Sequence, residues 1–505
     1  MKLTEQFTRA RNAGVPLVGV TTPDALACIE KLSPLANDHS PHIYWDCIKG
    51  LGYCNEEGKE WLSTIDEPRR MGSRHPDKAL EILADAPEDA VVFMVNIHMF
   101  LHLQTVLQGI CNLRDPYKGR GAMLVLLSPQ LMLPPELRDV VVFDDPLPTP
   151  EEIKNIITNV YNQTDEKLQA QGDKGLPKLK NSVFTQTSEK LRGLSCFIAE
   201  QSFAMGLSKD GVDQNVIWEQ KKQTVKQIRG LSVDEGIWTF DDMGGNAAIK
   251  EFGHKLFNGA EPPFVVVRVE EIEKKMGTEG PDAMAQTSDV SSDALDVILN
   301  GMEDNKWGGV VCVGPPGTGK SFFAQCLATT FGALGVCFDV NATRSKYVGE
   351  SELYIREAIK SIYAMGGSNV FFVATANDIK TLPPALRRRF WMGVYYFDMP
   401  DEIERAAIWK ICLARRNRKD KINEIPNDEG WTGAEIRNCV EFAYRFSCSL
   451  EEASKYIVPI ATSDPEGVER LRKYADGRLL SAAYKGKFRI PTETNTEKAR
   501  KVRVQ

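Results

Sequence analysis

The sequence predicts an α/β protein in which two regions of alternating strands and helices each build a mainly parallel sheet. Strand-like apolar runs alternate with helical stretches over residues 1–150 and again over 246–400. A glycine-rich phosphate-binding motif follows one such run in the second region, at 314–321. With 505 residues, of which 42% are hydrophobic and 26% charged, the chain is long enough for two or three domains of ordinary composition.

Changes in composition and periodicity mark the expected domain boundaries. Between 151 and 230 no clear strand stands out, whereas periodic apolar positions and many Lys, Gln and Glu residues favour helices. The last 21 residues contain seven Lys or Arg and two Glu, and this basic composition predicts a flexible tail. The predicted segments are an α/β module without a phosphate loop (1–150), a helical lid or linker (151–230), an α/β core with the phosphate loop (231–400), a helical C-terminal lid (401–484) and the basic tail (485–505).

Charge and cysteine content exclude several classes of function. The formal net charge of -7 counts against non-specific nucleic-acid binding by the whole molecule, because binding phosphates needs a basic surface. No apolar run approaches the roughly 18 residues that a bilayer requires, and the N-terminus lacks the apolar segment of a signal peptide. The 11 cysteines are scattered and form no CxxC pair, which predicts a reducing, cytoplasmic location. Neither a membrane nor a nucleic acid is therefore expected as a partner.

The phosphate-binding motif is the most specific feature of the sequence. It matches the pattern GxxxxGK followed by Ser or Thr, and it lies between an apolar strand at Gly309–Val313 and a helical run at Phe322–Phe331. The backbone N–H groups of such a loop and the helix N-terminus bind phosphate oxygens. Lys320 is expected to reach the β and γ phosphates of ATP, and Ser321 to hold Mg²⁺. The predicted ATP-binding residues are Gly314, Pro315, Pro316, Gly317, Thr318, Gly319, Lys320 and Ser321.

Hydrolysis also requires carboxylates at a strand end, which hold Mg²⁺ and activate water. No apolar strand that ends in Asp-Glu lies between Lys320 and Asn377, where such a strand is expected. Upstream of the loop, however, the apolar run Phe264–Val269 ends in Glu270 and Glu271. We predict that this unit has been transposed to precede the phosphate loop, since the position of a strand in a sheet need not follow chain order. The alternative is an inserted strand whose charges are solvated.

In the transposed arrangement, each polar residue has an expected role. Glu270 coordinates Mg²⁺, directly or through water, and Glu271 is the general base that activates the attacking water. Asn377 ends the next strand and is placed to orient that water. Arginines at 387–389 follow the helix start Leu382-Pro-Pro and are of the kind that stabilises developing charge. A solvated basic helix end is the alternative for any one of these arginines.

A weak internal repeat connects the two α/β regions. Leu133–Arg138 has the sequence Leu-Pro-Pro-Glu-Leu-Arg, and Leu382–Arg387 has Leu-Pro-Pro-Ala-Leu-Arg. The segments on both sides are also similar, which favours duplication over chance. Residues 1–150 contain no phosphate-loop pattern, and Thr21-Thr22-Pro23 follows the strand at the matching place. The first copy is therefore predicted not to bind a nucleotide in the usual way.

Taken together, these motifs resemble those of the AAA (AAA+) family of ATPases, whose core is a P-loop NTPase fold. The resemblance covers about 231–480, and residues 1–230 are more softly similar to the degenerate first module of the plastid-reading-frame AAA ATPases of algae and cyanobacteria. Glu270 stands where the family has Asp, and the Walker B segment precedes Walker A. The matching segments are Asp241–Gly245 (linker), Gly314–Ser321 (Walker A), Ala374–Asn377 (sensor 1), Leu382–Phe390 (arginine finger), Phe397–Glu402 (strand five) and Trp431–Glu435 (sensor 2).

The resemblance implies further roles and an assembly. Arg388 and Arg389 best match the fingers that act on the neighbouring subunit, although Trp391 stands where an Asp is usual. Gly433 and Ala434 match the sensor 2 turn that contacts the nucleotide, with Arg437 a weaker candidate. Tyr347 matches the aromatic residue of the pore loop, and a packed Tyr at a helix N-terminus is the equal alternative. Fingers that act in trans imply a ring, most often a hexamer.

Two functions from different classes fit the sequence. The first is an ATP-hydrolysing, ring-forming remodeller of protein partners, which Tyr347 and the finger arginines favour. The second is a nucleotide-gated regulatory or binding protein with slow or no hydrolysis, which Glu270 and the degenerate first module favour. A nucleic-acid motor is disfavoured by the acidic balance of the chain.

Overall fold

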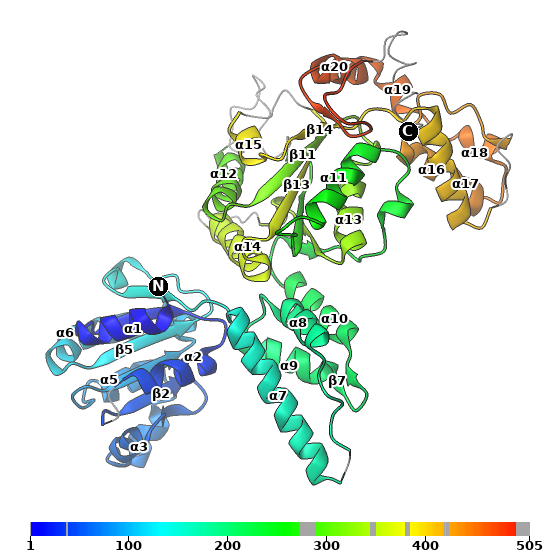
Figure 1. Cartoon of the computed structure of the whole chain (residues 1–505). Coiled ribbons are helices and arrows are strands. Elements are labelled where there is room, and N and C mark those ends of the chain that lie inside the picture. The colour runs from blue at the N-terminus through cyan, green and yellow to red at the C-terminus, as the bar shows by residue number, and fades with distance from the viewer. Residues whose placement is uncertain are drawn as a thin grey trace. The chain divides into compact units, whose positions relative to one another are not determined.

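The computed structural model describes residues 2–36, 39–172, 174–272, 289–343, 350–378, 384–418, 420 and 424–490. The chain divides into two compact units, Met1–Ile217 and Trp218–Gln505, and each is described by itself. Both units contain a mainly parallel sheet covered by helices (Figure 1), so the predicted α/β class is confirmed. No helix in these ranges is long and apolar enough to cross a membrane.

The sheet of the first unit has six strands in the order β3-β2-β4-β5-β1-β6. All neighbours are parallel except β2 and β3, which are antiparallel. Every residue of the central strand β5 is buried, as expected for a continuous apolar run covered on both faces. The strands are β1 (Leu17–Thr21), β2 (His42–Asp46), β3 (Gly50–Tyr53), β4 (Val91–Val95), β5 (Met123–Ser128) and β6 (Val141–Asp144).

Helices cover both faces of this first sheet. Side chains of α1 and α2 share one apolar cluster with Val18 and Phe93, and side chains of α5 and α6 share another with Val92 and Leu126. The alternating faces of the strands therefore supply two separate cores. The helices are α1 (Leu3–Asn12), α2 (Ala25–Leu32), α3 (Glu56–Ser63), α4 (Glu67–Gly72), α5 (Pro76–Leu83) and α6 (Gln104–Arg120).

A helical region follows in the same unit. It contains α7 (Pro150–Ala170), α8 (Asn181–Leu191), α9 (Cys196–Gly206) and the start of α10 (Gln214–Lys226). The sequence indicated no strand here, but a short antiparallel hairpin joins β7 (Leu207–Ser208) to β8 (Gly211–Val212). Helix α7 begins at a capping box in which Thr149 and Glu152 satisfy each other's backbone N–H groups, which explains why the helix starts at Pro150.

The sheet of the second unit has seven strands in the order β15-β14-β11-β13-β10-β12-β9. Only β9 runs antiparallel to its neighbour. Strand β10 pairs with β13 on one side and with β12 on the other, although it precedes both in the chain. The strands are β9 (Leu231–Val233), β10 (Val265–Val269), β11 (Gly308–Val313), β12 (Leu334–Phe338), β13 (Val370–Ala376), β14 (Val394–Tyr396) and β15 (Leu480–Ser481).

Figure 1 shows α12 and α14 on one side of this sheet and α11 and α13 on the other. Leu299 and Ile362 belong to the apolar core of the first side, and Ile249 and Phe323 belong to that of the second. The helices of this core are α11 (Ala247–Phe257), α12 (Asp289–Asp304), α13 (Lys320–Phe331), α14 (Glu350–Gly366) and α15 (Pro384–Arg389).

Helices α16, α17 and α18 form a small cluster with a core of its own, in which Trp409 packs beside Trp431. Leu471 and Ala475 of α20 belong instead to the core of the sheet. After them, β15 returns to pair with β14. The predicted flexible tail does not begin at 485, because Phe488 is 2% exposed and packs on Tyr396. Residues 491–505 lie outside the described residues. The helices are α16 (Glu402–Arg415), α17 (Gly433–Arg445), α18 (Leu450–Ser454), α19 (Ile460–Ser463) and α20 (Pro465–Ala475).

Candidate nucleotide-binding site

A cavity of about 610 Å³ lies where the C-terminal ends of β10, β11 and β13 meet. Its volume is within the range of roughly 300–1,000 Å³ that small-molecule sites occupy. The C-terminal edge of a parallel sheet is also where α/β proteins bind their ligands. The predicted site residues that line the cavity are Pro316, Gly317, Thr318, Gly319, Lys320, Ser321, Glu270, Glu271, Asn377, Gly433 and Ala434.

The phosphate loop joins β11 to α13. Gly317 and Gly319 have φ of +83° and +97°, values that favour glycine. A Cβ on Gly317 would lie 2.7 Å from the Thr432 hydroxyl oxygen, so the loop also leaves no room for a side chain there. Helix α13 begins at Lys320 without a side-chain cap, and its first N–H groups face the loop as in an anion site.

The Lys320 ammonium group points into its own loop. Its Nζ donates hydrogen bonds of 2.8 Å to the carbonyl oxygens of Gly314 and Pro315, which do not themselves line the cavity. The residue is only 6% exposed. A buried ammonium group at a cavity wall is suited to bind an anion, since burial weakens its hydration.

The two carboxylates directly follow β10. Because β10 lies beside β13, Glu270 and Glu271 reach the same cavity as Lys320 and Ser321. The N–H of Glu271 donates to the Thr375 hydroxyl at 3.3 Å, which connects the acidic segment to the strand that carries Asn377. Glu271 has a left-handed φ of +47°, an unusual conformation outside glycine that often occurs at functional sites. The transposed strand thus lies in the same sheet as β11, with β13 between them, and the two carboxylates line the same cavity as the phosphate loop. Their catalytic roles stay predictions.

Glu270 has a charged partner that the sequence did not indicate. Its carboxylate forms an ion pair with Arg268, a residue of β10 that lies two positions earlier in the chain. The other end of the Arg268 guanidinium group binds the Asp234 carboxylate at 2.7 Å. The apolar pattern of the strand predicted no such pair, although the arginine in a run of valines was the available signal.

The helical lid contributes one wall of the cavity through the turn at Gly433 and Ala434. Helix α17 begins there with a capping box between Thr432 and Glu435. The N–H of Ala434 donates to the carbonyl oxygen of Gly317 at 3.2 Å, so the sensor 2 turn contacts the phosphate loop directly. Arg437, one helical turn later, also lines the cavity.

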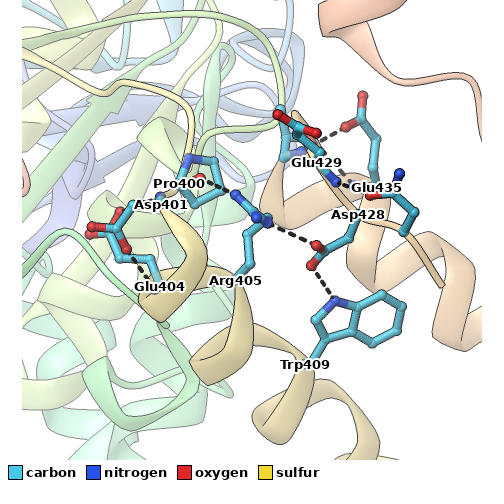
Figure 2. Close-up of polar contacts among 10 residues, drawn as sticks. Pro400, Asp401, Glu404, Arg405, Trp409, Asp428, Glu429 and Glu435 are labelled. Carbon is cyan, nitrogen blue, oxygen red and sulfur yellow. Dashed lines mark hydrogen bonds and ion pairs between the residues drawn. The ribbon is translucent and has the colours of Figure 1, made fainter. Parts of the chain in front are cut away.

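Figure 2 shows how the lid is joined to the core. Arg405 on α16 donates to the carbonyl oxygen of Pro400 at 3.1 Å and pairs with Asp428 at 3.1 Å. The indole N–H of Trp409 donates to the same Asp428 carboxylate at 2.9 Å. These contacts fix the segment that precedes Trp431 and thereby the start of α17.

Besides Gly314 and Pro315, the two predicted finger residues, Arg388 and Arg389, are not among the residues that line the cavity. Arg388 and Arg389 instead form ion pairs of 3.2 and 2.9 Å with Glu303 of α12. The Arg388 side chain is 80% exposed and that of Arg389 only 22%, so Arg388 is the more accessible. Tyr347 lies outside the described residues.

The side of the cavity away from the phosphate loop was not predicted from the sequence. The Arg415 guanidinium group lies 3.2 Å from the ring centroid of Trp238, which is a cation–π contact. Glu404 accepts a hydrogen bond of 3.0 Å from the N–H of Asn246 and so joins α16 to the segment before α11. Glu404, Ile408, Cys412 and Arg415 recur every three to four residues along α16, and this spacing could have indicated that they share one helix face. The missed lining residues include Trp238, Met243, Asn246, Glu404, Ile408, Cys412 and Arg415.

Comparisons with known families agree with this geometry. Residues 3–145 match the family of SpoVK-like AAA ATPase N-terminal domains. Residues 310–367, which include the phosphate loop, match the AAA family, described as ATPases associated with various cellular activities. The chain therefore contains AAA ATPase domains on a P-loop NTPase fold.

Among individual proteins, the chain is homologous to the AAA domain-containing protein ycf46. It is 24% identical to that of Pyropia yezoensis, over 96% of this chain and 100% of the relative. It is 23% identical to that of Guillardia theta, over 87% and 88% of the two chains. The proteasome-activating nucleotidase of Saccharolobus islandicus is 31% identical over 27% of this chain and 47% of its own length. The predicted relationship to the ycf46 group is confirmed.

Proposed function

We propose that this protein binds ATP with Mg²⁺ in the cavity and hydrolyses it. The observation that carries the proposal is the meeting of Glu270 and Glu271 with Lys320 and Ser321 in one cavity, despite their reversed order in the chain. The AAA domain match at the phosphate loop supports ATP as the nucleotide.

Each group has a part in the proposed reaction. The N–H groups of the phosphate loop and the Lys320 ammonium group bind the phosphates, and Lys320 exchanges its carbonyl partners for phosphate oxygens. Glu271 takes a proton from the attacking water, and Asn377 orients that water. The wall formed by Gly433 and Ala434 excludes bulk water from the phosphates.

The donor set near Lys320 suits Mg²⁺. Ser321 offers a hydroxyl oxygen and Glu270 a carboxylate oxygen, and both line the cavity. Magnesium prefers such hard oxygen ligands, and it commonly uses only one or two protein groups together with the phosphates. When bound, the ion neutralises charge on the phosphate oxygens.

The finer proposal is a ring-forming remodeller of protein partners, most simply a hexamer in the cytoplasm. The exposed Arg388 supports it, since a finger that acts in trans must reach a neighbouring subunit. The printed name of one relative, proteasome-activating nucleotidase, suggests nucleotide-driven work on a protein partner. In this proposal Tyr347 grips the substrate.

A second candidate is a nucleotide-gated regulatory protein with slow or no hydrolysis. The observation that favours it is the ion pair between Glu270 and Arg268, because the proposed metal ligand already has a cationic partner. The two candidates differ in whether bound ATP is turned over.

Replacing Glu271 with Gln separates them. If Glu271 is the base, turnover falls about 100-fold or more, while ATP binding persists because Gln keeps the shape of the side chain. Turnover is measured as phosphate release and binding by calorimetry. Glu429→Gln, at an exposed lid position, is the matched control and keeps full turnover. Undiminished hydrolysis by Glu271→Gln would refute its role as the base.

The ring is tested separately by light scattering with and without ATP, using Glu271→Gln to keep the nucleotide intact. If the protein is a hexamer in ATP, and Arg388→Ala still forms the hexamer but hydrolyses ATP poorly, a finger that acts in trans is supported. A monomer under all conditions contradicts the ring.

A further inference from the structure

Arg268 is a charged residue in the middle of a buried strand. Strand β10 has the sequence Val-Val-Val-Arg-Val, and Arg268 is only 7% exposed. Strands β13 and β12 flank it on both sides. A guanidinium group is costly to bury unless its charge is paired, so the fold must gain something specific from it.

The two carboxylate partners of Arg268 differ, because one is anchored to the sheet and the other faces the cavity. One terminal nitrogen binds Asp234 at 2.7 Å, and the other binds Glu270. The N–H of Asp234 donates to the carbonyl oxygen of Gly335 in β12 at 2.9 Å, so this partner is itself anchored to the sheet. Glu270 is at the other end, with its side chain 42% exposed at the cavity. The guanidinium group therefore links a fixed carboxylate to the one that faces the cavity.

We propose that Arg268 is a positioning residue that holds the Glu270 carboxylate where it binds Mg²⁺ of the nucleotide. The inference rests on the proposed function of the cavity. Glu270 directly follows β10 and is two residues after Arg268, and the ion pair shows that the two side chains meet. A guanidinium group presents its N–H donors in a rigid plane and can fix one carboxylate oxygen while the other stays available.

The first unit provides an internal reference for this assignment. A left-handed residue follows each of the two equivalent strands: Asn96, with φ of +57°, directly follows β4, and Glu271, with φ of +47°, is the second residue after β10. Counted back from these residues, the counterparts of Glu270 and Arg268 are Val95 and Phe93. The unit that lacks the carboxylates thus has a fully buried phenylalanine in place of the arginine. At this pair of equivalent positions, the arginine accompanies Glu270 and the phenylalanine accompanies Val95.

The inference is tested by equilibrium binding, independently of hydrolysis. The affinity of the full chain for the non-hydrolysable analogue AMP-PNP is measured by calorimetry with Mg²⁺ and with EDTA, and the ratio is the gain from the metal. Arg268→Met keeps the length of the side chain but removes its charge. We expect this gain to fall about tenfold, as for other residues that orient metal ligands, and the affinity in EDTA to stay unchanged.

Two variants keep the test decisive if Arg268→Met folds poorly. Asp234→Asn keeps both Arg268 and Glu270 but loosens the anchor, so the gain from Mg²⁺ should fall by a smaller factor. Arg268→Lys keeps the charge without the planar fork and should restore part of the gain. Arg418→Met, which removes another largely buried, paired arginine of the lid, is the control for a general loss of packing and should leave the gain unchanged.

Each outcome decides a different point. A wild-type gain that Arg268→Met retains overturns the inference but not the proposed function. A larger gain in Arg268→Met also overturns it, because Arg268 would then compete with the metal. A wild-type protein that gains nothing from Mg²⁺ removes the proposed metal site and the inference together.

Discussion

Six strands of each sheet can be matched in the same spatial order across the sheet, but the matched strands follow one another differently along the chain. Read from β6, the first sheet is β6-β1-β5-β4-β2-β3, and the second, read from β14, is β14-β11-β13-β10-β12-β9. In both, the last strand is antiparallel to its neighbour. In the first unit the strand in the fourth place, β4, comes after β1, β2 and β3 in the chain, whereas in the second unit the strand in that place, β10, precedes β11. The duplication suggested by the sequence repeat therefore has a structural counterpart.

This difference teaches that the position of a strand in the sheet, rather than its place in the chain, sets what it contributes to the cavity. Parallel strands pair through their backbones, and the connecting helices can supply crossovers of different order. As a result, Glu270 and Glu271 meet Lys320 at the C-terminal edge of the sheet even though they come about 50 residues before it.

The units also differ at the end of the strand that leads to the phosphate loop. In the second unit six residues, 314–319, separate β11 from α13, whereas only 22–24 separate β1 from α2. In this shorter loop the Thr22 hydroxyl donates to the Asp145 carboxylate at 2.9 Å, and Lys31 pairs with it at 3.2 Å. The Asp145 carboxylate, which already pairs with Lys31, therefore lies beside this short loop. Its negative charge disfavours the binding of a phosphate there.

The largest expected effect follows from this contrast. Lys320→Ala should remove nucleotide binding from the whole chain, with the affinity for ATP falling about 100-fold or more, because two charge-assisted hydrogen bonds to phosphate are lost. Calorimetry should find one site per chain in the wild type and none at comparable concentrations in the variant. Lys31→Ala, in the first unit, is the matched control and should leave both affinity and stoichiometry unchanged. A second site that survives Lys320→Ala would mean that the first unit also binds nucleotide.

The sequence was sufficient for much of this fold because its signals are local. Apolar runs such as Met123–Leu127 predicted buried parallel strands, and the confirmed α/β class follows from their alternation with helices. The acidic strand was found because an apolar run ended in two carboxylates. Its neighbours in the sheet could only be hypothesised, since strand pairing depends on contacts far apart in the chain.

What the sequence could not give is the pairing of individual side chains. Trp238 and Arg415 are 177 positions apart and meet only when the lid packs beside the core. Arg268 was overlooked for the same reason, because its partner Asp234 belongs to another strand segment. The basic composition after 484 suggested a tail, but one phenylalanine, Phe488, inserts into the core and keeps residues up to 490 on the sheet. Burial of one large side chain outweighed the local charge.

A smaller effect is expected from removing the charge of Asp145 in the first unit, where its carboxylate binds Thr22 and Lys31. Asp145→Asn removes the charge that Thr22 and Lys31 share, and should lower the free energy of unfolding of this unit by about 1–3 kcal/mol. Hydrogen exchange in urea, followed by mass spectrometry of peptides from the buried strand β5, measures the loss in this unit. ATP affinity should not change, since the cavity belongs to the other unit.

The control for this change is Asp139→Asn, which breaks an exposed ion pair with Arg114. Exposed pairs contribute only about 0–1 kcal/mol, so this variant should unfold almost as the wild type does. Equal losses in the two variants would show that the Asp145 cluster has no special weight. Weaker ATP binding in Asp145→Asn would break the assignment of nucleotide binding to the second unit alone.

The smallest expected effect is on the alkylation rates of two cysteines, which lie in different units and have similar pKa values. Burial raises the pKa of Cys412, which lines the cavity, to about 11, and burial likewise raises that of Cys54 in the first unit to about 11. Both thiols are therefore protonated at pH 8, and alkylation by iodoacetamide should be slow and rise about tenfold per pH unit up to about 11. With ATP and Mg²⁺ at a fixed pH, Cys412 should be protected several-fold and Cys54 not at all. Alkylation of each cysteine is followed by peptide mass spectrometry. Equal protection of Cys54 would mean that the nucleotide also acts on the first unit, and the contrast between the two units would fail.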